Sequence, residues 1–505
     1  MTPAELKRRL GAGGELAILD AREEGEFGRS HLFWAVPCPL SKKELRARAL
    51  LPRRSIPVVC VDGGEGHAAK LADYLRGIGC TDVHVLQGDP ASAFTLFSGV
   101  HVPSKAFGEW VEHHHGTESL DPPELDALVR SGVPHVILDS RPMDEFVKMT
   151  IPGAVNVPGG ELAWRIGDLV PDPATTIVVN CAGRTRSIMG AESLRRAGVP
   201  NRVVALRNGT MGWELAGFTT EKGATRAFPP GTPRSAALAK ERAERFAAQH
   251  GVGGITRAEA ARLLEAQDRS TYALDVRTPE EYAAGHIPGF RHAPGGQLVQ
   301  ATDQWIAARG ARVILADGEG VRARMTGAWL RQMGGWDVLV VTDPLAGPME
   351  AGPWRPEVPE RRAVPALTPA ELAALGDAVQ VVDLARSIDF RAAHIPGSRW
   401  VVRGRIPPFP KPVVVTAPDP ILADLAAAEI PGARVLAGGV AAWRAAGLPL
   451  ASDRHHPEDE DCVDWYLRPY DRNSGQEAAM HEYLRWEVDL VHGVARDGDA
   501  RFGAW

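Results

Sequence analysis

The chain has 505 residues, of which 44% are hydrophobic and 24% charged, and its formal net charge is -6. This length and composition predict a globular protein of three or four domains, and the negative charge excludes a general attraction to nucleic acid or to an anionic membrane surface. The sequence contains no run of about 18 uncharged apolar residues that would span a bilayer, and its polar N-terminus lacks the apolar core of a signal peptide.

The first predicted element is a helix that begins after Thr2, because TPAEL places a glutamate three residues after a capping threonine. An apolar strand, AILDAR, follows and contains Asp20 at its end. A second strand, PVVCV, then leads into a helix with the sequence HAAKLADYLRGIG. Alternating strands and helices indicate a parallel sheet with helices on both faces.

The same order of elements returns three more times along the chain, which indicates an internal repeat. The helix starts recur as DPPEL, TRAEA and TPAEL, and the first strands recur as VILDSR, YALDVR and VVDLAR. Each first strand ends in an aspartate: Asp20, Asp139, Asp275 and Asp383. At a fixed distance after each aspartate lie His31, Thr150, His286 and His394. We interpret the histidines of this series as structural.

Proline, glycine and charge concentrate around 100–118, 226–252 and 351–366, where we predict linkers. The division that follows has a first unit at 1–105, a second at 106–228, a helical linker at 229–252, a third unit at 253–355, a fourth at 362–452 and a tail at 453–505. The tail has helical apolar spacing at Met480, Tyr483, Leu484, Val488 and Val491. We expect a helix that docks on the domain assembly; alternatively, Trp465, Tyr466 or Trp486 shapes the mouth of an active site.

The loop after the second strand distinguishes the four units, because these loops read DGGEGHA, CAGRTRS, DGEGVRA and APDPILA. Equivalent positions hold Asp62, Cys181, Asp317 and Ala417 in chain order. Only the second unit therefore carries a nucleophile, and it also carries two arginines. The chain's five cysteines are scattered and form no CxxC pair, which argues against a disulfide framework or a zinc cluster. We expect a cytoplasmic protein with no metal and no cofactor.

The second unit resembles the rhodanese, or thiosulfate sulfurtransferase, family. The phrases DSR, IPGA, CAGRTRS and GTMGW match the family's pattern, and the resemblance extends over residues 1–452 in four copies. Together with the segment RPYDRNSGQEAAMHEYLRWE, the layout looks like that of bacterial multi-domain members. The resemblance implies an α/β fold of four tandem rhodanese-like domains, each a parallel sheet with helices on both faces, followed by a helical tail.

The same resemblance implies an enzyme that moves a sulfane sulfur from thiosulfate or a similar donor through a persulfide on Cys181. The acceptor it implies is cyanide, a small thiol or a protein thiol, with no nucleic acid and no membrane as partner. Because the other three units lack the cysteine, we expect them to be inactive as sulfurtransferases.

The residue types of the loop suit this chemistry, because a thiolate is the reactive form of cysteine and a free thiol has a pKa of about 8.5. Backbone N–H groups at a tight turn and a helix start favour an anion. We expect Arg184 and Arg186 to lower the thiol pKa and to bind thiosulfate. Gly183 permits the turn, and Ser187 caps the next helix or donates to the sulfur. The predicted substrate-binding residues are Ala182, Gly183, Arg184, Thr185, Arg186 and Ser187.

Five residues outside the loop are predicted to support the site. Asp139 and Arg141 are expected to form a structural pair, because equivalents persist in units without the cysteine. Glu145 is predicted to pair with Arg186 and orient it. Met211 and Trp213, from the GTMGW phrase, are expected to pack under the loop and to contact an acceptor.

Other interpretations stay open at this stage. The chain is alternatively a non-enzymatic scaffold in which Cys181 senses redox state or carries sulfur. A cysteine-based phosphatase is a further alternative. The loop of the related dual-specificity phosphatases resembles this one but has five residues between cysteine and arginine, whereas four residues separate Cys181 from Arg186. Cys60 is a candidate resolving thiol, although an ordinary buried cysteine is the simpler interpretation. We interpret the histidines at 113–115 as a solvated linker rather than a metal site.

Overall fold

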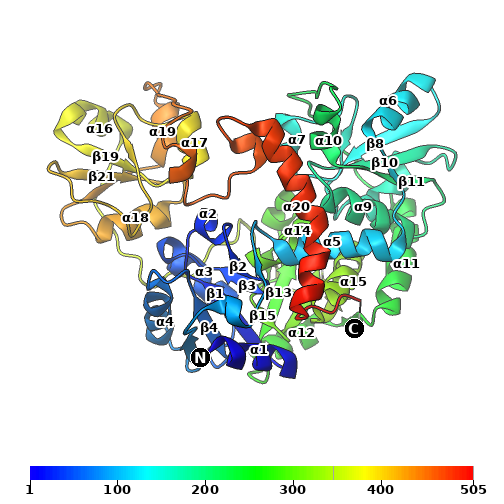
Figure 1. Ribbon diagram of the computed structural model, residues 1–505, viewed down its shortest axis with the longest axis horizontal. Coiled ribbons are helices and arrows are strands. Elements are labelled where there is room, and N and C mark those ends of the chain that lie inside the picture. Colours follow the sequence, from blue (N-terminus) through cyan, green and yellow to red (C-terminus); the bar gives the residue numbers. More distant parts are fainter. Residues whose placement is uncertain (345, 504–505) are drawn as a thin grey trace.

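Four five-stranded sheets, parallel except for one added strand in the first, organise the computed structural model, which describes residues 1–344 and 346–503 (Figure 1). Residue 345 of the predicted third unit and residues 504–505 of the predicted tail lie outside the described part of the chain. The α/β class, the repeated domains and the helical C-terminal segment predicted from the sequence are confirmed.

The second unit contains a five-stranded sheet in the order β7-β11-β10-β8-β9, and all of its strand pairs are parallel. Its strands are β7 (Ser119–Leu120), β8 (His135–Asp139), β9 (Val155–Asn156), β10 (Thr176–Asn180) and β11 (Val203–Leu206). Its helices are α6 (Pro122–Ser131), α7 (Met143–Lys148), α8 (Leu162–Leu169), α9 (Thr185–Arg196) and α10 (Gly209–Leu215). Every residue of β10 is buried, as expected for a central strand covered on both faces.

The third and fourth units repeat this strand order. The third sheet consists of β12 (Gly253–Ile255), β17 (Asp337–Val341), β16 (Arg312–Ala316), β13 (Thr271–Asp275) and β14 (Arg291–His292). Its helices are α12 (Arg257–Glu265), α13 (Pro279–Ala284), α14 (Gly295–Gln300) and α15 (Arg322–Gly334). The fourth sheet consists of β18 (Ala366–Leu367), β22 (Arg434–Leu436), β21 (Val413–Thr416), β19 (Gln380–Asp383) and β20 (Arg399–Trp400). Its helices are α16 (Pro369–Leu375), α17 (Ser387–Ala392), α18 (Pro420–Ala428) and α19 (Gly439–Ala445).

The first unit departs from the pattern, because its sheet borrows a strand from the third unit. Its own strands are β1 (Leu16–Asp20), β3 (Ala35–Pro37), β4 (Val58–Val61) and β5 (Val83–Val85), and β2 (His31–Leu32) pairs with β6 (Leu96–Phe97) in a small second sheet. Its helices are α1 (Pro3–Ala12), α2 (Glu24–Phe27), α3 (Lys43–Leu50) and α4 (His67–Gly77). The added strand, β15 (Ala308–Arg309), pairs antiparallel with β1. The first and third units thereby share a sheet and a continuous apolar core.

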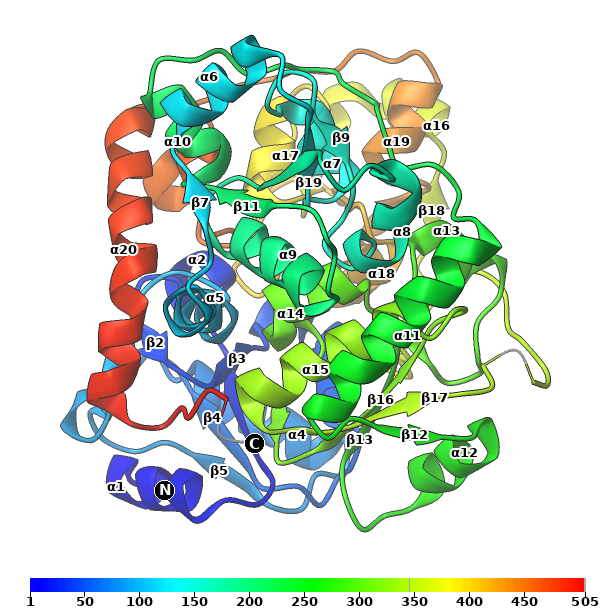
Figure 2. The same cartoon turned by 90° about the vertical axis from the view of Figure 1, so that its right-hand side faces the viewer.

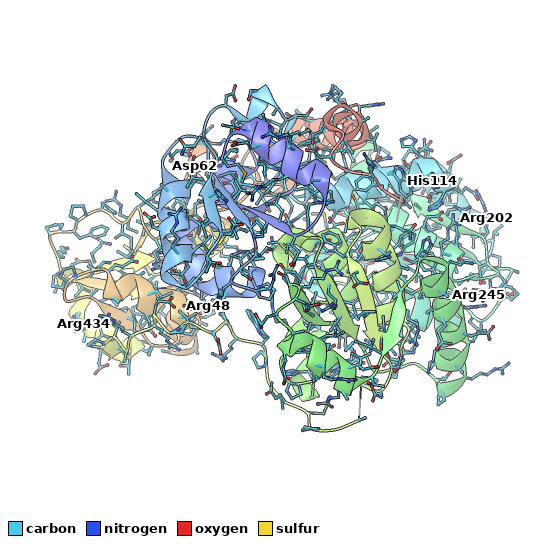
Figure 3. All side chains as sticks on the ribbon, turned by 90° about the horizontal axis from the view of Figure 1, so that it is seen from below. Arg48, Asp62, His114, Arg202, Arg245 and Arg434 are labelled. Atoms are coloured by element: carbon cyan, nitrogen blue, oxygen red, sulfur yellow. The ribbon has the colours of Figure 1, made fainter. Side chains whose placement is uncertain are left out.

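The fourth unit has its own apolar cores and projects to one side of the molecule (Figures 1 and 3). Figure 3 shows Arg434 in this projecting unit and Asp62 in the neighbouring first unit. A buried ion pair joins the two units, because the Arg403 guanidinium donates to the Glu44 carboxylate at 2.7 and 3.0 Å.

The prediction of a linker over 100–118 is wrong, because this segment forms helix α5 (Val102–His115) in the centre of the molecule (Figure 2). Phe107 on α5 is fully buried, and α5 packs against α9, α15 and the tail helix. The predicted boundary between the first two units therefore falls inside a packed helix. The second linker contains helix α11 (Pro233–Gln249), which buries Phe246 and packs against α8 and α15.

The tail ends in helix α20 (Gln476–Asp497), which lies against α5 (Figures 1 and 2). Aromatic side chains of the tail fix the position of this helix by packing on glycines of the first unit. A Cβ added to Gly99 would lie 2.3 Å from the Trp486 ring, and one added to Gly28 would lie 2.4 Å from the Tyr466 ring. Such contacts leave no space for a larger residue, so the tail is docked closely on the first unit.

Candidate active site

Cys181 lies between the end of β10 and the start of α9, in a turn that we call the Cys181 loop (residues 181–187). The start of α10 holds this loop from the other side: the Thr210 N–H donates to the Cys181 carbonyl at 2.9 Å, and the Met211 N–H donates to the Ala182 carbonyl at 3.0 Å. Gly209 has φ +55°, and a Cβ there would lie 2.2 Å from the Cys181 carbonyl oxygen. Only glycine fits this close approach.

The Cys181 side chain is 2% exposed, and its Sγ lies 3.4 Å from the Ser187 hydroxyl. The Ser187 hydroxyl donates to the Arg184 carbonyl at 2.8 Å, and between Cys181 and Ser187 either group can be the donor. Burial raises the pKa of Cys181, and the Arg186 charge and the Ser187 hydrogen bonds offset this only in part. Arg186 therefore lowers the thiol pKa as expected, but desolvation outweighs this positive charge, and the net shift of the pKa is upward.

The two arginines of the loop are held by different carboxylates. The Arg186 guanidinium donates to both oxygens of Glu145 at 2.8 Å. Burial alone would raise the pKa of Glu145, but the charge and hydrogen bonds of Arg186 lower it to about 2. Arg184 donates to both oxygens of Glu109 at 2.8 Å and also pairs with Glu112. Two carboxylates thus pair with the positive charge of Arg184, whereas Glu145 pairs with that of Arg186.

Asp139 and Arg141 form a buried pair beneath the loop, with N–O distances of 2.9 and 2.7 Å. The Thr150 hydroxyl and the Asn180 amide also donate to Asp139. Equivalent pairs join Asp20 to Arg22 and Asp275 to Arg277 in units without the cysteine.

The fourth unit breaks this arrangement, because one extra residue separates its arginine from the aspartate. Arg386 pairs with Asp389 instead, and burial raises the pKa of Asp383 to about 6. The histidines equivalent to Thr150 stack on aromatic rings of their own units, as His286 does on Tyr282 with centroids 3.8 Å apart.

A cavity of about 180 Å³ opens over the Cys181 loop. The second unit contributes Arg141, Glu145, Lys148, Met149 and Met211 to its walls in addition to the loop residues 181–186. The remaining walls come from three other parts of the chain: His101 and Lys105 at α5, Gln297, Gln300 and Ala301 at α14, and Arg468, Tyr470, Asp471, Tyr483 and Glu487 in the tail. The site is therefore composite, although its nucleophile and both loop arginines belong to one unit.

Trp213 does not line this cavity. It lies in a separate apolar core of the second unit with Phe146 and Ile151, and its indole N–H donates to the Thr219 carbonyl at 3.0 Å. Met211, in contrast, packs with Met480 and Leu484 of α20 beside the cavity.

Sequence reasoning missed the residues that α5 and the tail bring to the site. Lys105 lies in a segment interpreted as a linker, and its Nζ lies 4.8 Å from the Tyr483 ring and 4.6 Å from the Trp486 ring. The helical spacing of the tail included Tyr483, and that spacing was the only signal for its contribution. Nothing local marked Glu487, which is 1% exposed.

The equivalent loops of the first and third units bind their own carboxylates. Asp62 accepts from the Gly64 and Ala68 N–H groups at 2.9 and 2.8 Å. Asp317 accepts from the Gly320 and Ala323 N–H groups at 2.7 and 3.1 Å. An internal anion therefore takes the backbone donors that the second unit presents at its loop.

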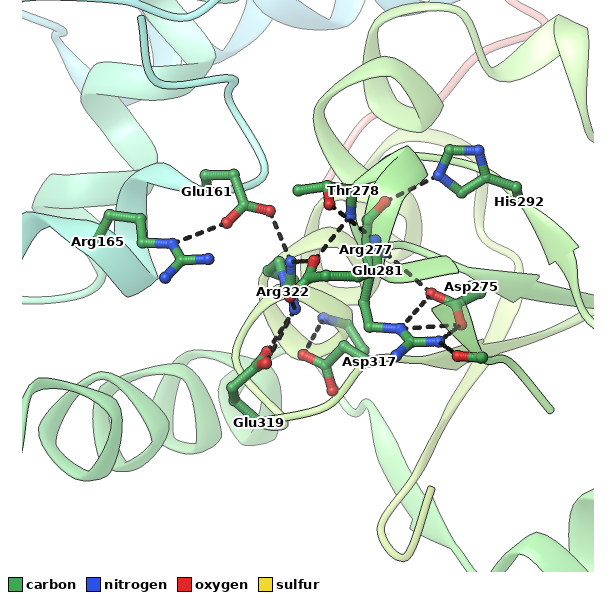
Figure 4. Close-up of polar contacts among 12 residues, drawn as sticks. Glu161, Arg165, Asp275, Arg277, Thr278, Glu281, His292, Asp317, Glu319 and Arg322 are labelled. Carbon is green, nitrogen blue, oxygen red and sulfur yellow. Dashed lines mark hydrogen bonds and ion pairs between the residues drawn. The ribbon is translucent and has the colours of Figure 1, made fainter. Parts of the chain in front are cut away.

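Arg322, at the position equivalent to Arg186, is fully buried and is surrounded by Glu161, Glu281 and Glu319 (Figure 4). Glu161 belongs to the second unit, so this cluster joins the second and third units. Three carboxylates therefore balance the positive charge of Arg322, whereas Arg186 pairs with Glu145.

Two of the other cysteines lie in a different setting from Cys181. Cys38 and Cys60 are fully buried in the core of the first unit, and burial raises the pKa of Cys38 to about 12 and that of Cys60 further. In residues 1–344 and 346–503, no three His, Cys, Asp or Glu side chains come together as metal ligands. His114, at the end of α5, stacks on Trp110. Within the same described ranges, no helix is both long and apolar enough to cross a membrane.

Comparison with known proteins finds a repeated family domain in this chain. The family model of the Rhodanese-like domain matches residues 2–90, 121–216 and 256–343. The crystal structure of a thiosulfate sulfurtransferase from Pseudomonas aeruginosa is similar to this chain at 41% identity, with 99% of each chain covered and a TM-score of 0.91. An HTH-type transcriptional regulator from Mycobacterium tuberculosis is 37% identical over 89 residues, which are 17% of this chain and 38% of that relative. The fourth unit lies outside the matched ranges, although its sheet has the same strand order as the second and third sheets.

Proposed function

The chain belongs to the rhodanese-like family, and from this membership we propose that it is a thiosulfate sulfurtransferase that forms its persulfide on Cys181. The observation that carries the proposal is the position of Cys181 at the base of a small cavity, beside Arg186 and at the start of α9. A helix start and an arginine both favour an anionic donor.

In the donor step, the Cys181 thiolate attacks the outer sulfur of thiosulfate. The sulfur–sulfur bond of the donor breaks, sulfite leaves with the bonding electrons, and a persulfide remains on Cys181. An acceptor nucleophile then attacks the outer persulfide sulfur, and Cys181 leaves as a thiolate. Arg186 stabilises the anions in both steps, and Glu145 holds its guanidinium in place.

The proposal assigns catalysis to the second unit alone. In the first and third units, Asp62 and Asp317 bind the loop N–H groups that an anionic donor would need. The donor and acceptor remain as predicted, thiosulfate or a similar donor with cyanide or a thiol as acceptor. We also propose the cytoplasm as its compartment, since all five cysteines are free thiols.

The test is to incubate the protein with thiosulfate and cyanide and to follow thiocyanate. We expect turnover in the wild type and none in Cys181→Ser, with Cys60→Ser as the control that keeps turnover. Turnover that survives Cys181→Ser would overturn the proposal, and a wild type without turnover would favour the redox-sensing scaffold.

A further inference from the structure

Helix α20 brings the carboxylate of Glu487 to the Cys181 loop. Its Oε1 accepts a hydrogen bond from the Thr185 hydroxyl at 2.6 Å. Its Oε2 is buried and has no hydrogen-bond partner within the described part of the chain. A Cβ added to Gly183 would lie 3.1 Å from Oε2, so this oxygen lies directly over the loop backbone, and Glu487 is one of the residues that line the cavity.

A buried carboxylate is unexpected at a site that binds an anionic donor. Leaving a charged oxygen without a partner is destabilising, and its charge repels thiosulfate. The charge of Glu487 also adds to the effect of burial in raising the pKa of Cys181. Donor binding alone therefore gives no reason for this residue, whereas a step that removes a proton from a substrate does.

The charged and titratable groups around Glu487 come from every element packed against it. They are Lys105 and Glu109 on α5, Cys181, Arg184 and Arg186 in the second unit, and Arg468 and Tyr483 in the tail. Lys105 is 4% exposed, and Glu487 is the first of the charges that act on it. Lys105 is therefore one of the charged groups that face Glu487 inside the protein.

We propose that Glu487 is the catalytic base that deprotonates a small thiol, the sulfur acceptor of the Cys181 persulfide. The inference rests on the proposed function and adds the acceptor class and the residue that activates it. A cavity of about 180 Å³ is smaller than the roughly 300 Å³ at which pockets for drug-sized ligands begin, so the acceptor is a low-molecular-weight thiol.

The proton and the electrons balance within the site. The thiol transfers its proton to Oε2 of Glu487, and the resulting thiolate attacks the outer sulfur of the Cys181 persulfide. A new sulfur–sulfur bond forms on the acceptor, the bond to Cys181 breaks, and the electrons remain on Cys181. The proton on Glu487 then passes to the Cys181 thiolate, whose raised pKa favours the protonated form.

A single-turnover experiment on the full chain tests this role. The persulfide is installed with thiosulfate, the excess is removed, and its loss is followed by intact mass after addition of mercaptoethanol or sulfite. Mercaptoethanol must lose a proton before it attacks, whereas sulfite at mildly alkaline pH has none to lose. The variants are Glu487→Gln, which retains an acceptor for Thr185, and Glu482→Gln, an exposed control on the same helix.

We expect Glu487→Gln to slow transfer to mercaptoethanol about 100-fold, within the range of general base catalysis, and to leave transfer to sulfite as fast or faster because a repelling charge is removed. The deficit with mercaptoethanol should shrink as the pH rises above about 8.5, where thiols ionise without help. Glu482→Gln should behave as the wild type does.

Equal slowing with both acceptors would show a structural role and overturn the proposal, as would a deficit that does not change with pH. If Glu487→Gln lowers the melting temperature, the ratio of the transfer rates to mercaptoethanol and to sulfite in the folded protein still distinguishes a base from a structural residue. A wild type that thiosulfate does not load would instead contradict the proposed function, and the acceptor step can then be measured after loading with polysulfide.

Discussion

Replacement of Arg186 by methionine should weaken the use of thiosulfate, whereas the same change at Arg322 should not. The two arginines occupy equivalent loop positions, but their surroundings differ. Arg186 lines the cavity over Cys181 and, within the described residues, pairs with Glu145 alone. Arg322 is fully buried among three carboxylates, away from any cysteine (Figure 4).

The expected magnitude follows from these contacts. A hydrogen bond to a charged group contributes about 1.5–3 kcal/mol, and each 1.4 kcal/mol is about tenfold in an equilibrium constant. Arg186→Met should therefore lower kcat/KM for thiosulfate about 10- to 150-fold. Loss of one partner from a buried ion pair costs about 3–5 kcal/mol, so Arg322→Met should lower the melting temperature and leave kcat/KM near that of the wild type.

The assay is thiocyanate formation at varied thiosulfate, with thermal unfolding of both variants followed by circular dichroism. An Arg322→Met protein that is still folded at the assay temperature but loses as much kcat/KM as Arg186→Met would refute the reasoning. An Arg186→Met protein with unchanged kcat/KM would refute it equally.

Three further predictions follow from the same structure. Burial raises the pKa of Cys181 above that of a free thiol, so the thiol is protonated at neutral pH. The rate of sulfur loading from thiosulfate should therefore rise as the pH rises through that pKa. A loading rate that falls over this range would contradict the assignment of Cys181 as the nucleophile. Gly183→Ala should slow transfer by about tenfold or more, since its Cβ would lie 3.1 Å from Glu487 and 3.3 Å from Tyr483 and overpacking costs about 1–3 kcal/mol; steady-state kinetics measure the effect, and wild-type rates would show that α20 does not pack on the loop. Asp317→Ala should lower the melting temperature without changing the KM for thiosulfate, because two backbone N–H groups lose their acceptor; a raised KM would show that the third unit takes part in donor binding.

The repeat and its sheets were predictable from the sequence because their signals are local. Capping phrases, apolar strands and strand-end aspartates recur with constant spacing, and the alternation of strands and helices specifies a parallel sheet. Cys181 stood out by comparison of four equivalent loops. The partner of Arg186 was also predictable, since Glu145 lies in the first turn of the helix that follows the first strand of the same unit.

The composite part of the site was not predictable in the same way. The segment VPSKAFGEWVEHHH contains proline, glycine and three histidines, which resemble the composition of a linker. In the structure, Gly108 of this helix lies so close to Thr185 that a Cβ would be 2.7 Å from its methyl group. The glycine permits close packing of two helices and does not end one.

Contacts made by the tail are separated too far along the chain for any local pattern to reveal them. The hydrogen bond from Thr185 to Glu487 spans 302 residues. The net upward shift of the Cys181 pKa was not predictable for a related reason. A nearby arginine is visible in the sequence, but the degree of burial of the thiol is not. The strand that the third unit adds to the first sheet is likewise a contact between distant segments.

The most direct test of the account is the intact mass of the protein after incubation with thiosulfate and removal of the excess. The account predicts the mass of one added sulfur atom in the wild type, located at Cys181 by peptide mapping and absent from Cys181→Ser. Sulfur found on Cys60 or another cysteine, or an unchanged wild-type mass, would contradict the assignment of the persulfide to Cys181.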